Sequence, residues 1–159
     1  MKRLLLICLV FLGVALTVKA NGELDFASKY LMLYGQTYDI DCKTISPQMM
    51  ERILSGVAGS EDENTMRVLS QIKSIRILTT EPNACQAKTL FEKAEELAAQ
   101  NKRRYSVYSQ AHGKNIYVRR RGKQFLELVV VKQKEDHTFY MLNLTGYLSD
   151  KFLQQVLKM

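Results

Sequence analysis

The chain has 159 residues, which include 23 Lys or Arg and 16 Asp or Glu and give a formal net charge of +7. This length suits one domain with a hydrophobic core of its own, so the fold does not need a metal or many disulfides for stability. No Pro/Ser linker, internal repeat or low-complexity tract divides the chain, which argues against a multidomain or repeat protein.

Residues 1–20 have the layout of a secretory signal peptide. Lys2 and Arg3 precede an uncharged apolar run from Leu4 to Val18, and Ala20 is a small residue at a suitable cleavage position. The apolar run has about 15 residues, whereas a membrane-spanning helix needs about 20. We therefore predict cleavage after Ala20 and a mature chain over residues 21–159, soluble in the periplasm or outside the cell, with no transmembrane span.

Two cysteines, Cys42 and Cys85, remain in the mature chain. An oxidising compartment would allow them to form a disulfide, which in the chain-entropy model stabilises the fold by on the order of 4 kcal/mol. Two separate, buried free thiols are the alternative. Neither cysteine has a histidine at a spacing typical of metal ligands or of a catalytic pair.

The first part of the mature chain alternates helical and extended patterns. Ser46 is suited to cap a helix that starts at Pro47, and Ser60 and Glu63 have the spacing of a capping box. In chain order, the patterns predict a helix over residues 23–33, a strand within 36–45, a helix after Pro47, a helix over 60–72 and a strand over 74–80.

A turn at Pro82 begins a long helix of about residues 83–101, after which the apolar pattern changes to a period of two. Four strands follow, over 104–110, 114–120, 124–132 and 138–146, and a final helix over 148–158 has Ser149 as its cap. The short turns between these strands favour antiparallel neighbours. We predict an α+β fold, with an antiparallel-rich sheet of about five to six strands, helices packed on one face, and a C-terminal helix.

Positive charge is concentrated in the second half of the sheet. Residues 102–134 contain ten Lys or Arg and a single acid, Glu127. Alternate side chains of a strand point to opposite sides, so Arg119 and Arg121 share one side of their hairpin. The candidate binding surface is the basic hairpin, which consists of Arg119, Arg120, Arg121 and Lys123.

Three interpretations of the basic hairpin differ in their partner. Charged residues on hairpin strands can simply discourage pairing with another sheet. They can instead bind an acidic envelope component, such as a phospholipid headgroup, lipopolysaccharide phosphate or an acidic protein. Nucleic acid is disfavoured as a partner, because an exported protein rarely meets it and the sequence has no nucleic-acid-binding motif.

Four methionines, Met32, Met49, Met50 and Met66, lie on or near the short helices. Methionine adapts to irregular surfaces, so they could form a binding groove for another protein. Packing in the core is the simpler interpretation, because Met50 and Met66 already belong to apolar helical stripes.

Catalysis is not predicted. His112 and His137 lie in expected turns, and neither has the context of a serine or cysteine nucleophile. The acidic run at residues 61–63 lacks the alternating oxygen ligands of a calcium loop and suits a helix N-terminus. We expect no enzymatic activity, no cofactor and no metal.

The order of these elements, with "TISPQMMERI", "IKSIRILTTE" and "FYMLNLTGYLSDKFLQQVL", resembles the DUF4252 family of exported proteins from Bacteroidota. The resemblance covers nearly the whole mature chain and implies a cell-envelope protein without an established activity. Its motifs mark helix starts and strands and supply no catalytic residue. The expected function is to bind an acidic envelope partner through the basic hairpin. The alternative is a regulatory or structural protein-interaction domain that uses its sheet edge or Met-bearing helices.

Overall fold

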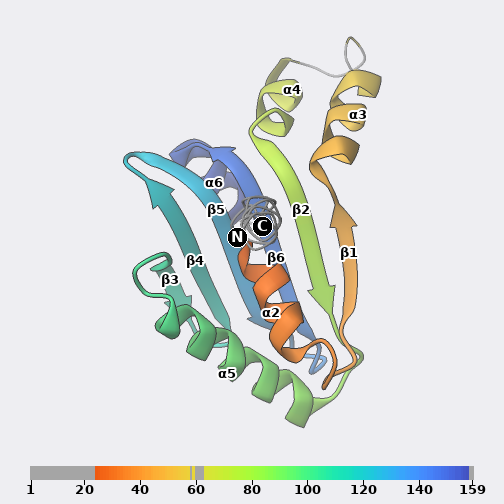
Figure 1. The fold of residues 1–159 in the computed structure, drawn as a ribbon, viewed down its shortest axis with the longest axis vertical. Helices are drawn as coiled ribbons and strands as arrows, with labels where there is room; N and C mark the ends of the chain where they lie inside the picture. The colour runs from red at the N-terminus through yellow and green to blue at the C-terminus, as the bar shows by residue number, and fades with distance from the viewer. Residues whose placement is uncertain (1–23, 58, 60–62, 158–159) are drawn as a thin grey trace, which may run out of the picture.

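The computed structural model describes residues 24–57, 59 and 63–157, which form five helices and six strands (Figure 1). The predicted signal peptide and the predicted cap Ser60 lie outside these residues. In chain order, the elements are α2 (Phe26–Tyr34), β1 (Asp41–Ile45), α3 (Pro47–Val57), α4 (Glu63–Leu69), β2 (Ile72–Thr79), α5 (Ala84–Gln100), β3 (Ser106–Ala111), β4 (Lys114–Arg121), β5 (Gln124–Gln133), β6 (Phe139–Leu148) and α6 (Asp150–Leu157).

The six strands form one sheet in the order β1-β2-β6-β5-β4-β3, and every neighbouring pair is antiparallel. Short turns connect β3 to β4, β4 to β5 and β5 to β6, so these strands are neighbours in the sheet as well as in the sequence. Strand β2 pairs with β6, from which α5 and strands β3, β4 and β5 separate it in the sequence. The predicted α+β class, the antiparallel sheet and the C-terminal helix are confirmed.

Local side-chain caps explain where several helices begin. The Ser46 hydroxyl accepts a hydrogen bond from the Met49 amide at 3.3 Å, and the Ser149 hydroxyl accepts one from the Phe152 amide at 3.2 Å. Each cap satisfies a backbone N–H that has no partner within the first helical turn. Both predicted caps are therefore confirmed.

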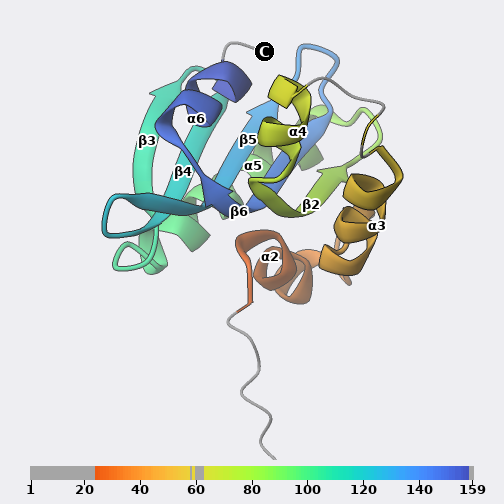
Figure 2. The ribbon, with the colours of Figure 1, turned by 90° about the horizontal axis from the view of Figure 1, so that it is seen from above.

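Helices cover both faces of the sheet, so the prediction that they pack on one face is wrong. Val129 and Val131 of β5 pack beneath α2 and α5, while Leu128 and Val130 point the other way, toward α6. Figure 2 shows α2 on one side of the sheet and α4 and α6 on the other. A strand that is apolar at successive positions has to be buried on both faces.

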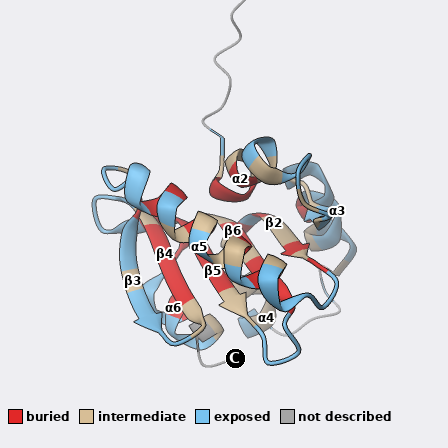
Figure 3. Ribbon diagram, turned by 90° about the horizontal axis from the view of Figure 1, so that it is seen from below, coloured by how far each residue is buried: buried red, intermediate tan, exposed pale blue. Residues whose placement is uncertain are grey.

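Two hydrophobic cores result, one on each face, and Figure 3 shows the buried strands β4, β5 and β6 between them. Tyr30 of α2 and Leu90 of α5 belong to the first core, and Phe152 and Leu153 of α6 to the second. The edge strand β3 is mostly exposed. Among the described residues, no helix combines the length and apolar character required to cross a membrane.

Candidate anion-binding surface

The basic hairpin does not present its four cations together. Arg119 is only 19% exposed, and its Nε lies 2.9 Å from Oε2 of Glu127. The register shifts between Arg119 and Arg120, and the Arg120 guanidinium lies 4.2 Å from the ring centroid of Phe125, which belongs to the second core. Arg121 and Lys123 are exposed.

Arg119 and Arg121 instead join two cations from β2, which come from a distant part of the sequence. The four side chains line a hollow of about 570 Å³ on the face of the sheet that carries the first core. In Figure 1, α2 and α5 cover the part of this face away from the β4–β5 turn, and no described helix lies in front of the part near it. We call this surface the basic hollow and define it by Lys73, Arg76, Arg119 and Arg121.

The side chains of β2 and β6 that face the first core are apolar at one end of each strand and polar at the other. The polar ones form the floor of the basic hollow. On β2, Leu78 is buried in the first core, whereas Arg76 and Ser74 continue the same row toward the hollow. On β6, Met141 is likewise in the core and Thr145 reaches the hollow. The Ser74 and Thr145 hydroxyls lie 2.6 Å apart and hydrogen-bond across the two strands.

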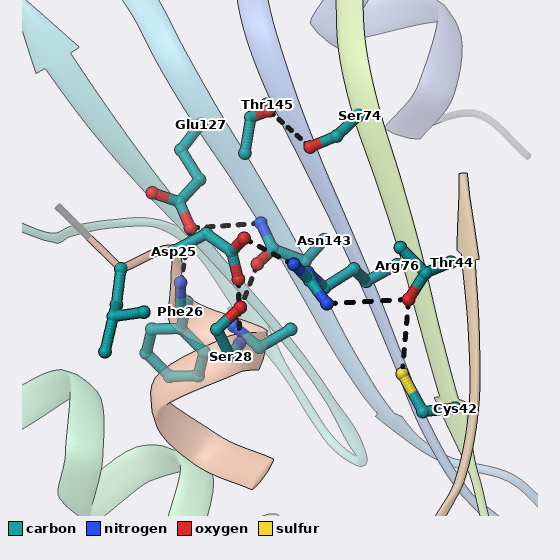
Figure 4. A network of polar contacts seen from close by, with 12 residues as sticks. Asp25, Phe26, Ser28, Cys42, Thr44, Ser74, Arg76, Glu127, Asn143 and Thr145 are labelled. Carbon is teal, nitrogen blue, oxygen red and sulfur yellow. Dashed lines mark hydrogen bonds and ion pairs between the residues drawn. The ribbon is translucent and has the colours of Figure 1, made fainter. Parts of the chain in front are cut away.

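A fully buried carboxylate, Glu127, lies where the polar rows meet the first core (Figure 4). Its Oε1 accepts hydrogen bonds from the Phe26 amide at 2.6 Å and from Asn143 Nδ2 at 3.0 Å. Its Oε2 accepts from the Tyr105 hydroxyl at 3.1 Å and from Arg119 Nε at 2.9 Å. Four donors, one of which is the Arg119 cation, compensate for the loss of hydration that burying a carboxylate entails.

The same network fixes the N-terminus of α2 on the sheet. After Phe26, the next two backbone amides also find side-chain acceptors: Ala27 donates to Asn143 Oδ1 at 2.8 Å, and Ser28 to Asp25 Oδ1 at 2.7 Å. The other oxygen of Asp25 pairs with Arg76 Nε at 3.1 Å. Arg76 and Arg119 thus each neutralise a carboxylate that caps the positive end of the helix.

The two remaining cations of the basic hollow have no carboxylate partner within the part of the chain that the structure describes. Lys73 donates to the Tyr147 hydroxyl at 3.5 Å, and its Nζ lies 4.5 Å from the centroid of that ring. Arg121 lies at the mouth of the hollow, next to Gln124 and Tyr147. Lys73 and Arg121 are therefore the cations that are available to a negatively charged ligand.

Burial raises the pKa of Tyr105 above its usual value of 10.0, and the negative charge of Glu127 raises it further. The phenol consequently keeps its proton throughout the physiological range and continues to donate to Glu127.

Sequence reasoning missed Lys73 and Arg76 as site residues, because they lie in β2, far along the chain from the hairpin. It also missed the structural role of Glu127 and Asn143. Both occur at inward positions of otherwise apolar strands, within "FLELVVV" and "FYMLNLTG". A polar residue at a buried position needs hydrogen-bond partners. Glu127 and Asn143 in these apolar runs therefore indicated a buried polar network.

The other predicted sites are dispersed. Cys42 is half-buried and Cys85 exposed, and both are free thiols in the structure, so it contains no disulfide between them. Met50 is buried in the second core, whereas Met49 is 47% and Met32 64% exposed. Met66 is half-buried on α4.

His112 and His137, predicted in separate turns, line the same hollow of about 790 Å³ at the other end of the sheet. This hollow lies beside the β3–β4 turn and the β5–β6 turn. The pairing of β4 with β5 makes the two turns neighbours, and the spacing of the residues in the chain does not indicate this.

The fold and the site together define an α+β domain with a six-stranded antiparallel sheet and a basic hollow on one face. A family model described as a domain of unknown function (DUF4252) matches residues 34–156, and the chain belongs to this family. Neither the curated proteins nor the solved structures gave a match to the chain.

Proposed function

We propose that this protein is a binding protein without catalytic activity, and that it holds an acidic partner in the basic hollow. Two cations, Lys73 and Arg121, support this proposal, because they line a hollow of about 570 Å³ and have no carboxylate partner among the described residues. Arg76 and Arg119 lie beside them, each paired with a carboxylate, and the hydroxyls of Ser74 and Thr145 line the floor. The one acid among the described residues of its lining, Asp25, is paired with Arg76, and cations that line a hollow concentrate negatively charged groups there.

The location of the partner belongs to the same proposal. The layout of residues 1–20 supports export, so the acidic partner is an envelope component: a phospholipid headgroup, lipopolysaccharide or an acidic protein. Mass spectrometry of the protein from the native cell envelope should find Asn21 as its first residue. An intact N-terminus in a cytosolic fraction would contradict export.

Binding is tested with the mature chain, residues 21–159, in co-sedimentation with anionic vesicles and lipopolysaccharide and in titration with an acidic peptide, each across a salt series. The test variant is Lys73→Gln with Arg121→Gln. We expect binding of at least one probe at low salt, weakened about tenfold or more in this variant, since two charge contacts are lost.

The matched control changes two exposed lysines outside the hollow, Lys43→Gln with Lys88→Gln, and alters net charge equally. Equal weakening in both double variants would show a non-specific charge effect and would refute the basic hollow as the site. Arg119 is not a suitable test residue, because its replacement leaves Glu127 buried without a cation.

A second candidate function, a protein-interaction domain, is favoured by exposed apolar side chains away from the hollow. Val107 is 55% exposed on the edge strand β3, and Met49 is 47% exposed on α3. An exposed strand edge can pair with an extended segment of another protein. Binding of this kind would be nearly insensitive to salt and to the charges of Lys73 and Arg121.

A further inference from the structure

A second group of cations lies at the other end of the sheet from the basic hollow. Lys114, at the start of β4, is the direct cross-strand partner of Lys132, near the end of β5. Lys132 in turn pairs with Tyr140 of β6, and the Lys134 Nζ lies 5.3 Å from the centroid of the Tyr140 ring. We call Lys114, Lys132 and Lys134 the lysine cluster.

The three lysines lie close together around one hollow. No ion pair joins any of them to an acid among residues 24–57, 59 and 63–157. Burial lowers the pKa of Lys132, and the charges of Lys114 and Lys134 lower it further. Like charges directly opposite each other on neighbouring strands destabilise a sheet, so this arrangement is unfavourable unless an anion binds.

The lysine cluster borders an apolar hollow. This hollow has a volume of about 330 Å³, and besides the three lysines and Tyr140 it is lined by Val130, Leu142 and Val156. Val130 and Leu142 belong to or pack against the second core, and Val156 lies in the last turns of α6. Cations and a phenol thus surround an apolar floor, within the size range of small-molecule sites in proteins.

On its other side, the lysine cluster borders the hollow of about 790 Å³ that is lined by His112 and His137. Two acids, Glu135 and Asp136, also line this side. The Asp136 carboxylate accepts a hydrogen bond from the Thr138 amide at 3.0 Å. Hydrogen bonding to the side chain and the backbone of Thr138 lowers the pKa of this carboxylate, and the charge of Lys134 lowers that pKa further. The apolar side, which has no acid in its lining, is the more favourable place for an anion with an apolar tail.

We propose that the lysine cluster and the adjoining apolar hollow form a binding site for an anionic amphiphile, an alkyl or acyl chain that ends in a phosphate, sulfate or carboxylate. The headgroup contacts Lys114, Lys132 and Lys134, and the chain lies against Val130, Leu142 and Val156. The charge of the cluster selects an anion, and the apolar floor selects an amphiphile over a free inorganic ion.

The experiment titrates the mature, isotope-labelled protein with dodecyl phosphate below its micelle concentration and follows backbone amide shifts by NMR. Inorganic phosphate and uncharged dodecyl maltoside are titrated in parallel. We expect shifts centred on Lys114, Lys132 and Val156, and dodecyl phosphate binding at least about tenfold more tightly than either comparison probe, since each supplies only half of the interaction. Equal affinity for inorganic phosphate or for dodecyl maltoside would overturn the proposal.

Two variants test the two halves of the site separately. Replacing all three lysines of the cluster by Gln should weaken dodecyl phosphate binding about tenfold or more, whereas Lys43, Lys88 and Lys151, changed to Gln together, should leave it unchanged. Val156→Phe fills the apolar hollow and should weaken dodecyl phosphate binding while leaving that of inorganic phosphate unaltered.

Wild-type affinity for dodecyl phosphate in the triple Gln variant of the cluster would overturn the proposal, as would wild-type affinity in Val156→Phe. Circular dichroism of each variant is the control that checks whether the fold is retained. Because Lys73 and Arg121 are intact in all these variants, failure of this proposal is distinguishable from failure of the basic hollow.

Discussion

Positive charge is concentrated at both ends of the sheet, but the cations have different partners at the two ends. At the basic hollow, Arg76 and Arg119 are each paired with a carboxylate that caps α2. At the lysine cluster, Lys114 and Lys132 face each other across two strands, and no acid in the described part of the chain is paired with them. Two of the four cations of the basic hollow therefore hold the fold together and leave Lys73 and Arg121 for a ligand, whereas the lysine cluster leaves all three of its cations for one.

The chemistry of the two cations accounts for this division. A guanidinium has several donors in a fixed plane, so Arg119 can bind Glu127 in a largely buried site with little loss of side-chain freedom. An ammonium is a compact and strongly hydrated charge that prefers water or a mobile partner. A count of basic residues along the sequence therefore does not measure the charge that is available for binding.

The largest expected difference between the two ends concerns stability. Arg119→Gln should lower the free energy of unfolding by about 3 kcal/mol, because it leaves the Glu127 carboxylate buried without its cation. Denaturant titration measures this loss. Exposed Arg121→Gln is the control and should change the same quantity by no more than about 0.5 kcal/mol. Equal effects at the two positions would mean that Arg119 is not structural.

A smaller loss is expected from Asn143→Ala, which removes the acceptor of the Ala27 amide and one of the two donors to Glu127 Oε1. Leaving the buried Ala27 amide unpaired and removing one donor to a buried carboxylate should cost about 2 kcal/mol. Amide hydrogen exchange should also become faster at the start of α2. Thr145→Ala, two residues along the same strand, removes only a part-buried bond to Ser74 and serves as the control. Unchanged exchange in α2 would refute the anchoring role of Asn143.

Alkaline pH should act in opposite directions on Tyr117, a buried tyrosine of the first core, and on the lysine cluster. Burial raises the pKa of Tyr117 to about 12, and the charge of Glu95 contributes, so between pH 10 and 12 only the unfolded state loses this proton. Stability should then fall with pH, by about 1.4 kcal/mol per pH unit for one such tyrosine. The fall should be shallower in Tyr117→Phe, and parallel denaturation profiles for this variant and the wild type across that range would contradict the assignment.

The effect of Lys132 on the pH dependence of stability has the opposite sign, because its pKa in the folded state is lowered below 10.5. As pH rises toward 10.5, the folded state releases this proton first, the unfolded state binds more protons, and stability increases with pH. The smallest predicted effect follows from the same repulsion: at pH 7, Lys132→Gln should raise the free energy of unfolding by about 0.5 kcal/mol. Thermal denaturation at two salt concentrations measures it, and a loss of stability would show that Lys132 is satisfied in the free protein.

Much of the fold could be predicted from the sequence, because its signals are local. The period of two after Tyr105, the short turns and the caps at Ser46 and Ser149 predict elements whose order and pairing are as observed. The placement of helices on both faces was not predicted, although the unbroken apolar run in β5 was a signal for it.

The candidate sites were predicted less well, because they depend on strand pairing. The basic hollow combines β2 with β4, which are not neighbours in the sheet, and the lysine cluster depends on the register of β4 with β5. The hairpin arginines were recognised as a group, but the sequence could not show that Glu127, the single acid among them, binds Arg119 in the interior.

The anchoring of α2 has a consequence for the order in which the chain folds. Its first two backbone amides are bound by Glu127 and Asn143, which lie 101 and 116 residues later in the sequence. A ribosome makes the helix early and its acceptors late, so α2 cannot dock until β5 and β6 exist. Helix α2, the first described element of the chain, therefore stays undocked until synthesis is nearly complete.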